Sequence, residues 1–255
     1  MKSINRYFSG LYLIVILYLF MFFTIPCFAS VDGLVGWDHG STGYENVMDK
    51  AKTKETPCVL FFYRELDRFC QKLGNDYFSK YEVYSFLEDI PKVDIDLGGN
   101  EFELELAEKY KVNSFDPTLL VVFPFSELDP IRITPFLDKK DMTPEEFVST
   151  LKNVFSLTYN KIAFSYFEEQ EYEKAIKYYE ISIKYDSERA YTYFALGTAY
   201  HGMAVEEKAP EYLKTAEEHY QKALELDPEF KECKDELEKL HDNMRKMGVS
   251  RGDTN

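Results

Sequence analysis

The segment PCVLFFYRELDRFCQKL (57–73) joins an apolar run to a stretch with helical spacing. Residues 57–63 carry no charge, which is typical of a strand covered on both faces of a sheet. Helical spacing follows from Asp67 to about Lys80, with Cys70 in the first turn. The segment therefore predicts a buried strand that leads directly into a helix.

The segments around this unit alternate between helix and strand patterns. Helices are predicted at 44–54, at 100–112 and after residue 143, and strands at 90–96, 117–123 and 130–136, the last one antiparallel. The last helix has a clear start, because Thr143 can cap it, Pro144 suits its first turn, and Glu146 completes a capping box. The order αβαβαββα predicts an α/β sandwich of roughly 110 residues.

Five of these segments together resemble the thioredoxin-like family, over residues 34–155. They are PCVLFFY, DRFC, KVDID, ELAEKYKV and FDPTLLVVF, which combine an apolar strand, a cysteine at a helix start, a V-D-I-D strand and a Pro-Thr-Leu-Leu strand start. The resemblance implies a thioredoxin-like fold. It also implies that Pro117 lies beside the redox site and that the Asp116–Pro117 peptide bond is cis.

From about residue 156 the pattern is helical only. Large and small residues recur at tetratricopeptide spacings: Tyr159, Ile162, Ala163, Tyr166, Tyr172, Ala175, Tyr179 and Ser182, then Tyr193, Leu196, Gly197, Tyr200, Ala216, Tyr220, Ala223 and Pro228. Residues 156–247 thus resemble two tetratricopeptide repeats with a capping helix, followed by a tail at 248–255. The predicted fold class is an α/β thioredoxin-like sandwich followed by an all-α tetratricopeptide helical array. Since such arrays usually need three or more repeats, docking on the first domain or dimerisation would have to complete it, and the sequence leaves both open.

The thioredoxin-like redox site is degenerate. Dithiol exchange needs an exposed thiolate at a helix N-terminus and a second, resolving thiol, but Asp67 occupies the first position and only Cys70 remains. Phe61 stands where the family often carries a buried acid. We therefore expect Cys70 to be a packed structural residue, with single-thiol chemistry as the alternative. The resemblance also implies that the backbone at Asp116, before Pro117, can pair with an extended peptide. The alternative is that Pro117 only maintains the turn.

The repeats predict a second candidate surface. The groove-facing positions of the first helix in each repeat are expected to be Leu157, Asn160, Phe164 and Phe167, and then Tyr191, Phe194, Thr198 and His201. This surface is aromatic and has few charges, which suits an apolar or amphipathic segment of a partner. It lacks the basic cluster that would hold a C-terminal carboxylate. Alternatively, these aromatic residues are buried against the first domain or the capping helix.

The N-terminus resembles a secretory signal. Residues 1–29 combine Lys2 and Arg6 with an apolar stretch and a small residue, Ala29, at the expected cut. The alternative is an uncleaved anchor over residues 8–25, although about 15 apolar positions fall short of the roughly 20 that span a bilayer comfortably. Cleavage would leave 28 basic and 45 acidic residues, a net charge of −17. So acidic a chain is a poor partner for nucleic acid.

Export permits disulfides, and cleavage after Ala29 would leave three cysteines, Cys58, Cys70 and Cys233. An odd number cannot all pair within the chain, and a strand separates Cys58 from Cys70. All three are therefore expected to be free thiols. Four histidines are scattered without zinc-ligand spacing, and we expect them to be solvated or on helix faces. The sequence predicts neither a metal nor a cofactor. The leading hypothesis is an exported, non-catalytic adaptor, periplasmic or extracellular, that binds protein or peptide partners. The alternatives are a single-thiol redox protein using Cys70 and a homodimer assembled through the repeats.

Overall fold

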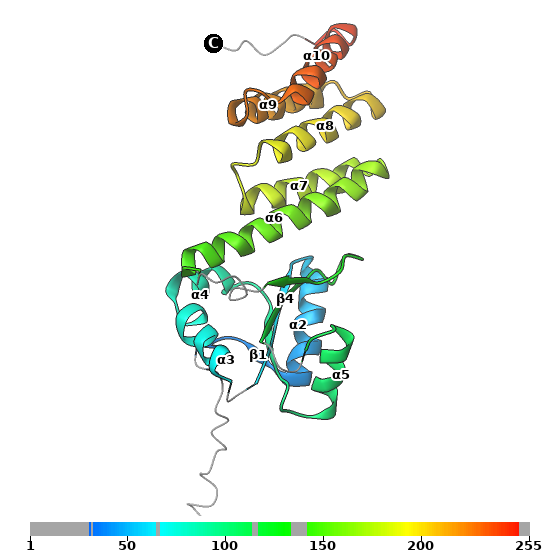
Figure 1. Ribbon diagram of the computed structural model, residues 1–255. Helices are drawn as coiled ribbons and strands as arrows, with labels where there is room; N and C mark the ends of the chain where they lie inside the picture. The colour runs from blue at the N-terminus through cyan, green and yellow to red at the C-terminus, as the bar shows by residue number, and fades with distance from the viewer. Residues whose placement is uncertain (1–30, 32, 65–66, 114–116, 134–141, 250–255) are drawn as a thin grey trace, which may run out of the picture.

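The computed structural model describes residues 31, 33–64, 67–113, 117–133 and 142–249. A mixed β-sheet with helices on both faces comes first, and a stack of helices extends from it (Figure 1). The signal or anchor predicted at residues 1–29 lies outside the described residues, as does nearly all of the tail. None of the helices in the described ranges has the length and hydropathy that crossing a bilayer requires.

The sheet has five strands in the order β1-β3-β2-β4-β5. The strands are β1 (Asp38–His39), β2 (Cys58–Tyr63), β3 (Lys92–Asp96), β4 (Thr118–Val122) and β5 (Ile131–Ile133). Strand β3 runs parallel to β1 and β2, whereas β4 is antiparallel to both β2 and β5. The uncharged run predicted as a doubly covered strand is therefore the central strand, and the predicted antiparallel strand is present. The short strand β1 was not predicted.

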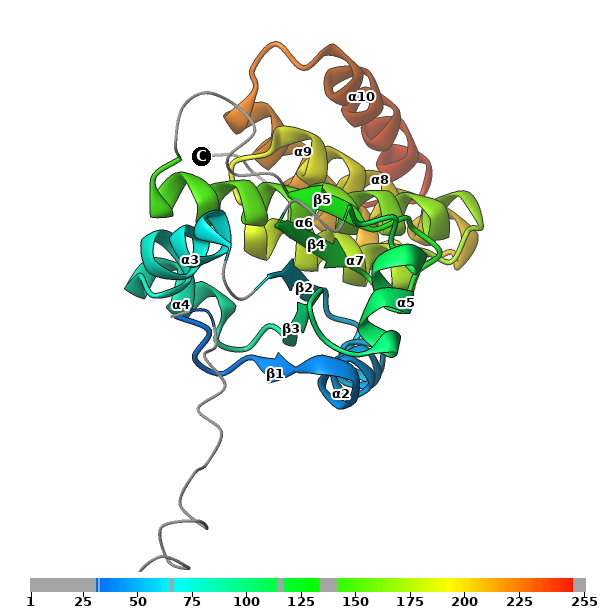
Figure 2. The same ribbon diagram turned by 60° about the horizontal axis from the view of Figure 1, so that its bottom comes forward.

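Helices cover the two faces of this sheet differently. On one face lie α2 (Gly40–Lys54) and α5 (Glu101–Lys109), which pack on Leu60 and Phe62 of β2. On the other face Val59, Phe61 and Tyr63 pack among α3 (Arg68–Leu73), η1 (Gly74–Phe78) and α4 (Tyr81–Leu87). Figure 2 shows the strands in order from β1 at the bottom to β5 at the top, with α3 and α4 to the left and α2 and α5 to the right.

One predicted helix is divided in the structure. The sequence predicted a single helix from Asp67 to about Lys80, but α3 passes at Gly74 into the π-helical turn η1, and α4 follows as a separate helix. The backbone of Gly33 packs closely on this point: a Cβ on Gly33 would lie 2.4 Å from the carbonyl oxygen of Gly74. Extended backbone at Lys80 then starts α4 in a new direction, with Val83 and Leu87 buried.

The helix α6 (Pro144–Glu168) joins the sheet to the helical stack without a linker. Thr143 accepts a hydrogen bond from the backbone of Glu146, whose carboxylate accepts one in return, so the predicted capping box is confirmed. Its first half buries Phe147, Leu151 and Phe155 against the sheet unit, and its second half is the first helix of the stack. The boundary predicted between residues 155 and 156 thus falls inside one continuous helix.

The stack continues with four helices, α7 (Tyr172–Tyr185), α8 (Ala190–Glu206), α9 (Glu211–Leu226) and α10 (Lys231–Lys246). The small residues Ala163, Ala175 and Ala216 of the recurring pattern are fully buried, so neighbouring helices can approach closely. At Gly197 of α8, an added Cβ would lie 2.8 Å from the Tyr220 ring and 3.1 Å from the carbonyl oxygen of Ala216. A side chain there would separate α8 from α9, so the glycine is required for this packing. Helix α10 covers the far end with Cys233, Leu240 and Met244.

The sheet unit and the beginning of the stack share one apolar core. Buried residues run without interruption from β2 and β4 through α6 and α7 to α8. Polar contacts at Glu55, after α2, reinforce this junction: the Tyr159 hydroxyl donates to its carbonyl oxygen at 3.0 Å, and the Tyr178 hydroxyl to its carboxylate at 2.9 Å. Lys177 pairs with the same carboxylate. Of the two ways considered for completing a short array, docking on the first domain is therefore present in the structure.

Candidate functional site

Asp67 is the N-cap of α3, and its carboxylate is engaged by that helix. Its Oδ1 accepts hydrogen bonds from the backbone N–H groups of Phe69 at 2.8 Å and Cys70 at 3.0 Å. A side-chain cap of this kind typically stabilises a protein by about 1 kcal/mol. The position at which a dithiol enzyme needs an attacking sulfur is thus held by a carboxylate with a structural task.

Cys70 lies beneath this cap and is shielded from solvent, with 1% of its surface exposed. Its Sγ accepts a hydrogen bond from the backbone N–H of Arg64 at 3.4 Å. Burial raises the pKa of the thiol to about 12, and the Asp67 carboxylate adds to this rise. Because the thiolate is the nucleophile in thiol chemistry, a buried thiol that stays protonated at neutral pH is a poor one.

The other positions of the redox site are also apolar or lie outside the described ranges. Phe61 is fully buried against the rings of Trp37, Tyr63 and Phe78. Pro117 is half-buried and directly precedes β4. Asp116 is not among the described residues, so the cis bond and the pairing of a peptide with its backbone stay predictions.

The sequence did not predict a buried carboxylate on the neighbouring strand. Asp94 of β3 is 3% exposed and lies beside Phe61 of β2 in the register. The Nδ1 of His39, on β1, lies 2.5 Å from its Oδ2. Burial raises the pKa of Asp94 to about 6, although the charge and hydrogen bond of His39 and a hydrogen bond from Tyr63 lower it. Asp94 lies in the middle of β3, inside the sheet.

The remaining histidines lie on helices, as expected, and each also has a specific partner. His241 pairs with Glu217 at 2.7 Å, the Nε2 of His201 lies 2.8 Å from Asn243 Nδ2, and His219 stacks on the Tyr200 ring. Burial lowers the pKa of His201 and of His219. Within the described residues no three histidine, cysteine or acidic side chains come together as a metal site. Cys58, Cys70 and Cys233 are all free and buried, as expected.

Most residues predicted to face a groove in the repeats do come together, along the seam between α6 and α8. A pocket of about 80 Å³ is lined by Phe164, Phe167, Tyr179, Tyr191, Phe194, Ala195 and Thr198. A wider groove of about 450 Å³ adjoins it, lined by Phe167, Gln170, Tyr172, Thr198, His201, Gly202, Val205, Glu206 and Asn243. We call these two spaces together the α6–α8 seam. Phe167 and Thr198 line both spaces, so the pocket and the groove lie side by side.

Several side chains along this seam are open to solvent. Phe164 is 43% exposed and Tyr191 is 49% exposed, and Val205 is exposed as well. Leu157, which was also predicted to face the groove, is exposed but lines neither space. Phe194 is half-buried, because its ring packs on Phe230 and Tyr220. The alternative in which the repeat aromatics are buried therefore applies to Phe194 in part and not to Phe164 or Tyr191.

Asn160 does not reach the seam, contrary to the sequence-based expectation. It is buried among α6, α7 and α8, and its Nδ2 donates to Ser182 Oγ at 2.7 Å and to Thr192 Oγ1 at 2.9 Å. The hydroxyl of Ser182 in turn donates to the carbonyl oxygen of Ser156 at 2.9 Å. This polar cluster ties three helices together and gives Asn160 an internal role.

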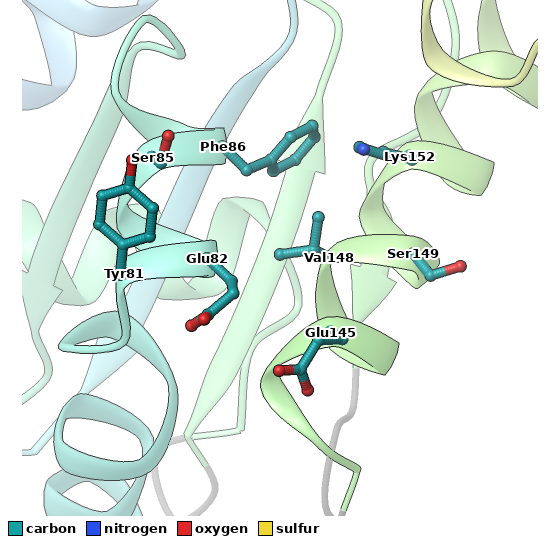
Figure 3. Close-up of a pocket in the computed structure, with 8 residues that line it drawn as sticks. All are labelled: Tyr81, Glu82, Ser85, Phe86, Glu145, Val148, Ser149 and Lys152. Carbon is teal, nitrogen blue, oxygen red and sulfur yellow. The ribbon is translucent and has the colours of Figure 1, made fainter.

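A third space lies between α4 and the start of α6, with a volume of about 600 Å³. Figure 3 shows Phe86, Val148 and Lys152 converging across it, while Glu82 and Glu145 lie toward one end and Ser149 points away. The Lys152 ammonium lies 5.8 Å from the centre of the Phe86 ring, so it covers part of the apolar floor. Phe86 itself stacks on Phe155, which leaves Tyr81 as the exposed aromatic ring of this groove.

Comparison of the chain with protein-family models gives no match. Comparison with curated proteins gives no significant match either. The candidate sites are therefore described from the structure alone. Asp67 caps α3 and Cys70 is buried beneath it, whereas the α6–α8 seam is aromatic and open.

Proposed function

We propose that the chain is an exported, non-catalytic adaptor in which a thioredoxin-like domain carries two tetratricopeptide repeats that bind protein or peptide segments. The strand order β1-β3-β2-β4-β5, with the Asp67–Cys70 helix following the central strand, supports the thioredoxin-like assignment. Paired helices with small residues at their contacts support the repeat assignment. The signal-like pattern of residues 1–29 supports export to the periplasm or the extracellular space.

The observation that carries this proposal is the α6–α8 seam. Phe164 and Tyr191 expose nearly half of their surfaces on either side of a small apolar pocket. Partly exposed aromatic rings around an apolar pocket are typical of surfaces that bind another protein, because burying them on association is favourable. The uncharged lining of the pocket fits an apolar side chain of a partner.

The redox position supports a non-catalytic reading of the first domain. Asp67 caps α3, and burial raises the pKa of Cys70 to about 12, so neither residue supplies a thiolate at neutral pH. The domain instead contributes the rigid junction at Glu55 and the shared core that hold the first repeat in place.

The test is chemical crosslinking and affinity capture from the native cell envelope, followed by quantitative mass spectrometry. We expect the double variant Phe164→Ala/Tyr191→Ala to lose most of the proteins that the wild-type chain captures. These two positions are preferable to Phe194, because Phe194 also packs on Phe230 and its removal would disturb the array.

Tyr81→Ala is the matched control, since Tyr81 is an exposed aromatic residue on α4, far along the chain from the seam. It should capture the same proteins as the wild type. Circular dichroism should show that all variants keep their helix content. Equal capture by the wild type and the double variant would mean that the seam is not the binding surface.

A further inference from the structure

The two ends of the α6–α8 seam differ in chemistry, and this difference indicates which kind of segment can bind there. Its narrow pocket lies near the N-terminal end of α8, around Phe194, and its wide groove lies near the C-terminal end, around Val205. In the seam Glu206 is the only charged lining residue among those the structure describes. The apolar and charged features are therefore separated along the helix.

The narrow pocket suits an aliphatic side chain rather than an aromatic one. Its 80 Å³ is about half of the roughly 150 Å³ of an engineered apolar cavity that accepts benzene. Its walls are mainly aromatic rings, together with the methyl group of Ala195 and the Thr198 side chain. The Thr198 hydroxyl already donates to the carbonyl oxygen of Phe194 at 2.9 Å and accepts from Tyr220 at 3.2 Å, so it offers little to a polar ligand.

The wide groove ends in negative potential. Four exposed carboxylates lie at the C-terminal ends of the two parallel seam helices: Glu168 and Glu169 at the end of α6, and Glu206 and Glu207 at the end of α8. Helix C-termini carry a partial negative charge, which adds to that of the carboxylates, whereas α7 begins at Tyr172 in the groove and its N-terminus contributes a partial positive charge. His201 in the groove does not offset this potential, because burial lowers its pKa and it is neutral at pH 7. Two cations oppose the carboxylates: Lys208, just beyond the end of α8, and Lys239 of α10, whose charge acts on His201 together with that of Glu236.

We infer that the seam accepts a segment of a partner protein that carries two features. One is a medium-sized aliphatic side chain, the anchor, which enters the narrow pocket. The other is a lysine or arginine farther along the segment, which lies near Glu206. This inference rests on the proposed function and defines its ligand. From Phe194 to Glu206 the helix rises about 18 Å, at 1.5 Å per residue. The anchor and the basic residue should therefore be about five residues apart in an extended segment, or about twelve in a helical one.

The experiment is a selection of random 16-residue peptides, displayed on phage, against the immobilised full-length protein. The peptides are counted by sequencing before and after selection on the wild type, on Phe164→Ala/Tyr191→Ala and on Glu206→Lys. Glu218→Lys is the matched control, because Glu218 is an exposed carboxylate on α9, which lines neither space.

We expect the wild type to enrich peptides that carry Leu, Ile or Met together with Lys or Arg at one of the two spacings. Glu206→Lys should reduce the enrichment of the basic residue roughly two- to five-fold, as removal of an exposed ion pair predicts, while the aliphatic preference remains. Glu218→Lys should leave both preferences unchanged.

The outcomes separate this inference from the function on which it rests. Peptides that depend on Phe164 and Tyr191 but show neither the aliphatic nor the basic preference would overturn the inference and leave the proposed function standing. If no peptide is enriched, or if the enriched peptides bind the Phe164→Ala/Tyr191→Ala variant equally well, both are overturned.

Discussion

At the scale of single residues, Asp67 and Cys70 decide whether the first domain can carry out thiol chemistry. The helix that a dithiol enzyme would use to stabilise a thiolate is here capped by a carboxylate, which accepts two backbone hydrogen bonds. The remaining thiol is buried, and its nearest negative charge opposes ionisation. Both effects could be predicted from the sequence, because they depend only on residues that are close together along the chain.

Replacing Asp67 with cysteine tests whether the geometry of a dithiol site is retained. The variant Asp67→Cys would have two thiols three residues apart at a helix N-terminus, and we expect them to form a disulfide on mild oxidation. The lost cap should lower the free energy of unfolding of the reduced variant by about 1 kcal/mol. Alkylation followed by mass spectrometry gives the number of free thiols. The control Asp67→Cys/Cys70→Ser should stay reduced, and failure of the single variant to form the bond would contradict the placement of Cys70.

Asp94 predicts a specific dependence of stability on pH. Its pKa is raised by burial to about 6, above its ordinary value of 3.8, so the folded protein binds this proton more tightly than the unfolded chain. The stabilisation that protonated Asp94 gives to the folded state is therefore fully present below pH 4 and is lost as the pH rises through 6. The free energy of unfolding falls by about 3 kcal/mol at most over this range, since one pKa unit corresponds to about 1.4 kcal/mol.

The variant Asp94→Asn should lack this loss, because the amide does not ionise. Urea unfolding between pH 4 and pH 8 should show the variant gaining stability relative to the wild type as the pH increases. Parallel curves for the two proteins over this range would be inconsistent with a buried, titrating Asp94.

The contact between His39 and Asp94 shows why some of the candidate sites could not be predicted from the sequence. It joins residues 55 positions apart, and one partner lies on a strand of only two residues, too short for a hydrophobic pattern. Alternation in 90–96 did indicate a strand, but not which neighbour would lie beside Asp94. Only the parallel pairing of β1 with β3 brings the histidine to the carboxylate.

At the scale of secondary structure, α6 is the element that connects the two parts of the molecule. Its start was predictable from Thr143, Pro144 and Glu146, since a capping box is a local signal. Its continuation through residue 155 was not, because the resemblances on either side suggested two domains with a boundary there. The division of the helix at η1 was not predicted either; it coincides with a close contact between Gly33 and the carbonyl of Gly74, which are far apart along the chain.

Interrupting α6 should separate the two parts. Leu157 is 47% exposed near the middle of this helix, so the direct effect of Leu157→Pro is on the backbone: it removes one hydrogen bond and introduces a clash. We expect a loss of about 3 kcal/mol or more in the free energy of unfolding and two thermal transitions in place of one. Differential scanning calorimetry gives the number of transitions. Leu157→Ala should keep a single transition, and a single transition in the proline variant would argue against α6 as the rigid connection.

At the scale of the whole molecule, a continuous core joins the sheet to the helical stack, and the junction at Glu55 adds polar contacts to it. The sequence predicted that two repeats would need support, but it could not identify the residues of the contact. Tyr159 was predicted from its repeat spacing. Its hydroxyl bonds with a carbonyl 104 positions away, which no local pattern indicates.

Removing that hydroxyl should weaken the junction. Tyr159 is buried, so Tyr159→Phe would leave the carbonyl oxygen of Glu55 without this partner, at a cost of about 1–2 kcal/mol in the free energy of unfolding. Tyr166→Phe is the control, because Tyr166 packs on Tyr178 through its ring. Urea unfolding should give equal stabilities for Tyr166→Phe and the wild type. An equal loss in both variants would mean that the hydroxyl of Tyr159 has no special role.

The central claim is that this molecule binds partners through the aromatic seam of its helical array and not through the start of α3, at Asp67 and Cys70. Site-specific photocrosslinking in the cell tests it directly, with p-benzoylphenylalanine placed either at Phe164 in the seam or at Phe69 on α3. Both side chains are exposed, Phe164 at 43% and Phe69 at 58%, so a probe at either position is open to a partner. We predict protein adducts from position 164 and none from position 69; adducts from position 69 alone would contradict the claim.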